Sequence, residues 1–200
     1  MGNVTENKKN KMTRIIDSAY ELFKSKSFNS TTIDDVVKAA GVAKGTFYLY
    51  FSDKYDLLDR LTIEKSADIF LDSFDYAFNN ESDSFINQFE VFTDCVIDRL
   101  NEHKELTAII QKNLSKCFIY LTETDDENIK SKLDYFISRM NELGFDKDRA
   151  LKCAYLITDL IGSVCCDALL QGKPYTLEEI RPLLHSSVVG ILGKGDSYAD

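Results

Sequence analysis

Apolar residues recur at helical spacing along most of the chain. Ile15, Ile16, Ala19, Leu22 and Phe23 follow an i, i+1, i+4, i+7, i+8 pattern, which predicts an amphipathic helix from about Lys9 to Lys26. The same period predicts a long helix that Ser52 or Asp53 caps and that runs to about residue 78. It also predicts helices over about 84–102, 104–121, 125–143, 147–171 and 177–192. The last of these opens with a capping-box pattern, Thr176 to Glu179.

Helix-breaking residues are sparse, because the 200 residues include only two prolines and nine glycines. No segment alternates apolar and polar residues as a half-buried strand would. The sequence therefore predicts an all-α fold of about nine helices.

Residues 32–51 carry sharper local signals than the rest of the chain. Thr32 and Asp35 form a capping-box pattern that begins a helix. Gly41 ends that helix, at a position where a residue in the left-handed backbone conformation is favoured. A short third helix then begins almost at once, at Ala43. A helix, a tight glycine turn and a second helix form the helix-turn-helix arrangement, whose second helix enters the DNA major groove.

The short helix has two faces. Phe47 and Phe51, four residues apart, are expected to point inward, while Lys44, Gly45, Tyr48 and Leu49 fall on the outward side. Tyr48, Thr46 and Lys54 offer phosphate partners, which fix position without reading sequence. The alternative is a compact three-helix unit in which these are ordinary surface residues.

Charge is distributed unevenly. The chain has a net charge of −9, yet residues 1–60 hold ten Lys/Arg against eight Asp/Glu, and the remainder holds fourteen against twenty-five. An acidic body repels phosphates, so any contact with a polyanion is expected at the N-terminal head.

The stretch TTIDDVVKAAGVAKGTFYLYFSDKYDLL resembles the N-terminal region of the TetR family of transcriptional regulators. The resemblance covers about the first sixty residues, and implies a homodimer that docks one head per subunit on a roughly palindromic operator. By matched position, it implies phosphate contacts from Thr32, Thr46, Tyr48 and Lys54, and base-facing positions for Lys44, Gly45 and Leu49. Asp34 and Leu49 depart from the pattern, where many members carry a basic residue and a histidine.

The resemblance further implies a helix-turn-helix DNA-binding domain over residues 1–55, joined by the long helix to a helical effector-binding and dimerisation domain over residues 56–200. We expect an unidentified small-molecule effector there, although an aromatic stripe at helical spacing is also typical of plain core. The candidate ligand-binding residues are Phe89, Phe92, Phe118, Tyr120, Phe136, Tyr155 and Asp159.

The last two helices carry small residues that allow close helix approach, with apolar residues between them, which indicates either a dimer interface or packing within the chain. The candidate interface residues are Gly162, Ser163, Cys166, Leu184, Ser187, Val188 and Ile191.

Other classes of function remain open. Cys165 and Cys166 suggest a thiol-based redox regulator, Cys117 with His103 a cysteine hydrolase, and Asp34 a protein adaptor that has lost DNA binding. The hydrolase lacks any glycine-rich nucleophile turn, and the cysteine spacings match no metal template. The favoured interpretation is a ligand-responsive regulator, most simply a repressor, with no catalysis, cofactor or metal.

The apolar segments of the sequence indicate in which cellular compartment the protein is expected. The polar N-terminus has no apolar region typical of a secretory signal, and Asp159 and Asp167 interrupt the longest apolar run, at 153–170. We therefore expect a cytoplasmic protein with no membrane partner.

Overall fold

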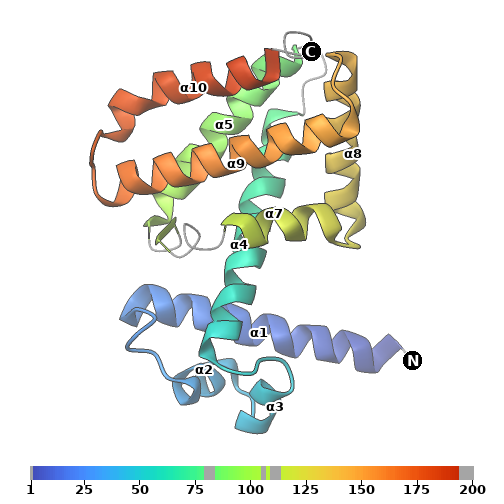
Figure 1. Cartoon of the computed structure of the whole chain (residues 1–200). Coiled ribbons are helices and arrows are strands. Elements are labelled where there is room, and N and C mark those ends of the chain that lie inside the picture. The colour runs from blue at the N-terminus through green and yellow to red at the C-terminus, as the bar shows by residue number, and fades with distance from the viewer. Residues whose placement is uncertain (1, 79–83, 105–106, 109–113, 194–200) are drawn as a thin grey trace. The chain divides into compact units, whose positions relative to one another are not determined.

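A computed structural model describes residues 2–78, 84–104, 107–108 and 114–193 (Figure 1). Nine helices and no strand fall within these ranges, which confirms the all-α class. The helices are α1 (Gly2–Lys26), α2 (Ile33–Ala40), α3 (Lys44–Tyr48), α4 (Lys54–Ala77), α5 (Phe85–Glu102), α7 (Leu114–Glu123), α8 (Glu127–Glu142), α9 (Lys147–Leu170) and α10 (Leu177–Gly193).

The chain divides into two compact units, and the division falls inside α4, between Glu64 and Lys65. The expected division after residue 55 lies about two turns earlier. Leu57 and Leu61, on the first turns of α4, are fully buried and belong to the first unit, which accounts for the difference. Asp53 caps the helix, since its Oδ1 accepts hydrogen bonds from two amides of the first turn at 2.7 and 2.9 Å.

The local signals read from the sequence are present. The Asp35 amide donates to Thr32 Oγ1 at 3.1 Å while the Thr32 amide donates to Asp35 Oδ2 at 3.0 Å, and Thr176 and Glu179 repeat this capping box before α10. Gly41 ends α2 in the left-handed region, with φ 62° and ψ 41°. Both capping boxes and this turn are therefore confirmed.

Two predicted helices differ in their limits. The first begins at Gly2 rather than near Lys9. The helix expected over 104–121 falls partly on residues 105–106 and 109–113, which lie outside the described residues. In the part that follows, α7 runs from Leu114 to Glu123.

In the second unit, α9 packs against α5, α7, α8 and α10, and Figure 1 shows α9 and α10 running side by side. Arg181 on α10 ties this helix to α5, because its guanidinium lies 2.9 Å from Asp94 and 2.5 Å from Asp98. In the described part of the chain, α9 is long and apolar enough to cross a membrane by length and composition. Its Ile157 and Ile161 are nevertheless buried inside the unit.

Candidate nucleic-acid interface and effector cavity

The α2–α3 corner is fixed from inside by aromatic side chains. Phe47 is fully buried and Phe51 is 3% exposed, and their rings lie 5.5 Å apart. The turn between the helices is fastened by Arg14 on α1, whose guanidinium donates to the carbonyls of Ala40 and Gly41. The left-handed backbone conformation at Gly41 favours glycine, and a Cβ there would lie 2.9 Å from that guanidinium, which would have to shift.

The opposite edge of α3 is open to solvent. Tyr48 is 52% exposed and Leu49 is 74% exposed, and Lys44 and Gly45 are also exposed. A Cβ added at Gly45 would meet nothing within 4 Å, so another surface can approach the backbone closely here. The inward and outward faces predicted for this helix are confirmed, whereas their contact with DNA stays a prediction.

Three of the four residues that are predicted to contact phosphates are partly buried or already hydrogen-bonded within the protein. Thr46 is half-buried, and the Thr32 hydroxyl is used in the capping box. The Lys54 ammonium donates to the carbonyls of Phe28 and Thr31 at 2.8 and 2.9 Å and lies 4.3 Å from the centre of the Phe28 ring. Two of the three ammonium donors of Lys54 are therefore already used, because it holds the α1–α2 loop to the start of α4.

Replacing Lys54 with methionine is expected to lower the free energy of unfolding by about 1–3 kcal/mol. The change leaves two partly buried carbonyls without their charged donor, while methionine keeps most of the aliphatic contact. Urea unfolding followed by circular dichroism measures the effect. Lys24→Met, at an exposed position of α1, is the control, and equal stability of the two variants would contradict this role for Lys54.

An ion pair bridges the two helices of the corner. Asp34 Oδ1 lies 2.7 Å from Lys44 Nζ, and both side chains are more than half exposed. The hydrogen bond to Asp34, together with its charge, raises the pKa of Lys44, so this ammonium stays protonated. The sequence pattern marks Asp34 as a departure from the family, but it does not indicate the pairing with Lys44.

An apolar cavity of about 140 Å³ lies within the second unit. Residues of α4, α5, α7, α8 and α9 line it, none of them charged. The hydroxyls of Thr122 and Thr158 in its wall donate to backbone carbonyls of their own helices, and Ser66 accepts from Cys117. The cavity therefore offers an almost wholly apolar surface to any occupant.

The predicted ligand-binding residues divide into two groups. Phe89, Phe92, Phe118 and Phe136 line the cavity. Tyr120, Tyr155 and Asp159 are not among the lining residues, and Tyr155 and Asp159 are exposed on α9. The predicted set of ligand-binding residues left out α4, although Ile69, Phe70 and Phe74 of this helix, and Phe78 just after it, also line the cavity.

The predicted dimer-interface residues also divide. Gly162, Cys166, Leu184 and Val188 are buried within the chain, so they offer no surface to a second copy. Ser163 and Ser187 are exposed and Ile191 is half-buried. Leu156 on α9 and Leu183 on α10 are 55% and 63% exposed, although neither belongs to the predicted interface set.

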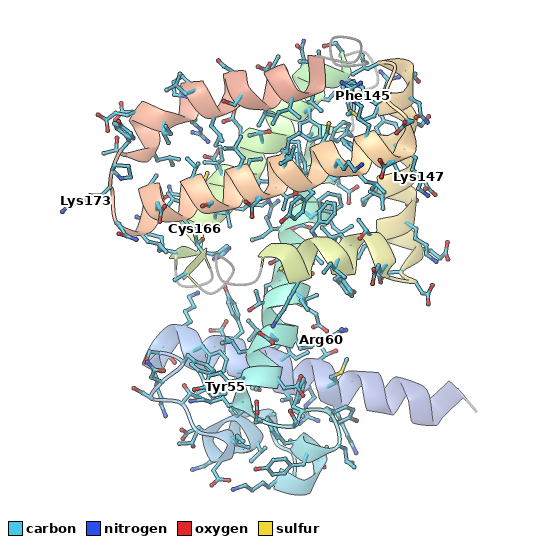
Figure 2. The ribbon with its side chains drawn as sticks, in the orientation of Figure 1. Tyr55, Arg60, Phe145, Lys147, Cys166 and Lys173 are labelled. Atoms are coloured by element: carbon cyan, nitrogen blue, oxygen red, sulfur yellow. The ribbon has the colours of Figure 1, made fainter. Side chains whose placement is uncertain are left out.

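The thiols are mostly inaccessible. Cys117, Cys153, Cys165 and Cys166 are buried, and Figure 2 shows Cys166 on α9. Burial raises the pKa of Cys165 to about 12 and that of Cys166 to about 11. The Cys117 thiol donates to Ser66 at 3.2 Å, and burial raises its pKa too. Because the thiolate is the reactive form, these environments disfavour a thiol switch and a cysteine nucleophile.

Metal binding has no support in the described ranges, where no group of three or more His, Cys, Asp or Glu side chains is placed to hold an ion.

Comparisons with known proteins address the first unit directly. Residues 15–61 match the family described as bacterial regulatory proteins, tetR family. The uncharacterized HTH-type transcriptional regulator YvdT of Bacillus subtilis (strain 168) is 46% identical over 48 residues, which are 24% of this chain and 25% of YvdT. Over these residues the chain is similar to the TetR family.

A second match is the fatty acid metabolism regulator protein of Bacillus subtilis (strain 168), 41% identical over 58 residues, which are 29% of this chain and 30% of that protein. Both relatives are thus matched over less than a third of their length. FadR from Bacillus subtilis, solved in complex with stearoyl-CoA, covers 92% of this chain and 99% of its own, with a TM-score of 0.55 and 20% identity. At that identity the likeness shows that the TetR fold extends through the second unit.

Proposed function

We propose that this TetR-family chain is a DNA-binding transcriptional regulator that acts as a homodimer, most simply as a repressor. The observation that carries the proposal is the exposed edge of α3, where Lys44, Gly45, Tyr48 and Leu49 stand clear of the protein while Phe47 is fully buried. A rigidly anchored short helix with small and polar outward residues suits the major groove.

We further propose that the effector carries a long apolar chain. The cavity of the second unit has no charged lining residue, and its threonine hydroxyls are satisfied internally, so it favours an alkyl or acyl chain over a polar ligand. Its volume of about 140 Å³ is small beside usual ligand pockets of roughly 300–1,000 Å³. A long chain therefore binds a widened form of the cavity, and binding shifts the equilibrium toward that form.

The response to the effector is carried by α4. Its residues Ile69, Phe70 and Phe74 line the cavity, and its first turns hold Leu57 and Leu61 in the core of the first unit. Widening the cavity displaces this helix and changes the placement of the DNA-binding heads. An effector alters operator affinity only by its differential affinity for the two arrangements, typically about 1–3 kcal/mol.

The dimer is proposed to form through the outer faces of α9 and α10. Leu156 and Leu183 supply exposed apolar area, and Ser163, Ser187 and Gly190 are small exposed positions that permit close approach. This surface lies on the same two helices as the predicted dimer interface, but it omits the residues of that prediction that are buried.

Fluorescence anisotropy with a duplex selected from a randomised DNA pool tests the function. We expect wild-type protein to bind the selected duplex at least about a thousandfold tighter than a scrambled one, and the affinity to fall steeply with salt. Tyr48→Phe is expected to weaken binding to all duplexes alike, whereas Lys44→Ala alters base preference. A protein that binds no duplex even at low salt is instead an adaptor with a TetR fold.

A further inference from the structure

Two opposite charges meet at the corner of the proposed DNA interface. Asp34 is the second residue of α2 and Lys44 the first residue of α3, and their side-chain atoms lie 2.7 Å apart with 71% and 53% of the side chains exposed. Both side chains project from the surface, where an ion pair contributes little to stability. A negative charge at this place weakens attraction to a polyanion, so the pair needs a functional explanation.

An unpaired lysine beside a duplex contacts any phosphate in reach, which raises affinity for all sequences equally. The ion pair changes this balance. One of the three Lys44 donors is held by Asp34, which fixes the direction of the ammonium and leaves two donors for another acceptor. The carboxylate itself repels phosphate but can accept a hydrogen bond from a base amino group.

We propose that Asp34 is a positioning residue that determines specificity, because it holds Lys44 away from phosphates and directs it to a base edge. The base pair that fits this pair of side chains is G·C. Guanine offers O6 and N7 as acceptors to a lysine, and cytosine offers its N4 amino group to a carboxylate. Asp34 and Lys44 together complement one such base pair in each half-site. This inference rests on the proposed DNA-binding function.

The experiment compares wild type, Asp34→Asn, Lys44→Ala and the double variant. Anisotropy titrations use the duplex selected with wild-type protein, its single base-pair substitutions and a scrambled duplex, each at several salt concentrations. Glu21→Gln is the matched control, because Glu21 is exposed on α1 and its replacement removes the same charge from the first unit. Thermal melts confirm that every variant is folded.

Asp34→Asn is expected to bind the scrambled duplex about five- to tenfold tighter than wild type at low salt, because Lys44 is released to phosphates. Each Lys44 that is released from Asp34 and contacts a phosphate makes the slope of log affinity against log salt concentration steeper by about 0.9. Discrimination at one G·C position falls about tenfold. When Lys44 is already replaced by alanine, the further change Asp34→Asn is expected to raise affinity for the scrambled duplex no more than Glu21→Gln does.

A second variant keeps the test sharp if Asp34→Asn is poorly folded. Lys44→Met keeps Asp34 and is expected to lose discrimination at a G·C position. If enough Asp34→Asn is folded to be measured, it must lose discrimination at that same position.

Three results would overturn the inference. If Asp34→Asn matches Glu21→Gln in affinity, salt slope and base preference while wild type still discriminates among duplexes, Asp34 only contributes charge and the proposed function stands. Loss of preference at different base pairs in the Asp34 and Lys44 variants refutes their joint action. Absence of any DNA binding by wild-type protein refutes the proposed function, and this inference with it.

Discussion

Phe47→Ala is expected to unfold the α2–α3 corner and abolish DNA binding. Phe47 is fully buried, and its ring lies 5.3 Å from that of Tyr48 and 5.5 Å from that of Phe51. Truncation of a buried phenylalanine typically lowers the free energy of unfolding by about 3–5 kcal/mol. Since small domains are stable by only about 5–15 kcal/mol, the loss is a large part of the stability of the first unit.

Urea unfolding followed by circular dichroism measures this change, and anisotropy with the selected duplex measures the binding. Leu49→Ala is the control, because Leu49 is 74% exposed and its truncation is expected to change stability by less than about 0.5 kcal/mol. Leu49→Ala still alters DNA binding if its side chain faces the bases. Retention of wild-type stability and binding by Phe47→Ala would show that α3 is not anchored as described.

Ala154→Leu is expected to close the proposed effector cavity and weaken binding of a long-chain acyl probe at least about tenfold. Ala154 lies on α9 and lines the cavity, and leucine places three more carbon atoms into a space of about 140 Å³. Because a cavity costs about 24 cal/mol for each Å³, filling part of it without clashes keeps or raises the stability of the free protein. A loss of binding with unchanged stability is thus the expected combination.

Isothermal titration calorimetry with the acyl probe measures the affinity, and thermal melts without ligand measure the stability. Ala39→Leu makes the same substitution at an exposed position of α2 and is expected to leave ligand affinity unchanged. Undiminished binding by Ala154→Leu would place the ligand elsewhere in the protein.

Features set by neighbouring residues could be predicted from the sequence. The capping boxes at Thr32 and Thr176 and the left-handed turn at Gly41 depend on backbone groups within three or four residues. The two faces of α3 follow equally from spacing, because Phe47 and Phe51 lie four residues apart on one side. For these elements the structure agrees with the expectation.

Features set by distant contacts could not be predicted. The carbonyls that hold Lys54 are 23 and 26 residues away along the chain, so its motif position alone pointed to phosphate contact. Helical spacing likewise cannot separate an aromatic residue that lines a cavity from one that faces solvent. Phe118 and Tyr155 illustrate this, since their rings meet at 5.3 Å but only Phe118 lines the cavity.

The central claim, that the exposed edge of α3 contacts duplex DNA, is tested most directly by photo-crosslinking. The probe p-benzoylphenylalanine replaces Leu49, and in a control protein it replaces Ile119 on α7, which is also exposed. We expect irradiation with the selected duplex to crosslink the Leu49 probe and not the Ile119 probe. Crosslinking from Ile119 but not from Leu49, or from neither under conditions where the duplex is bound, would contradict the account.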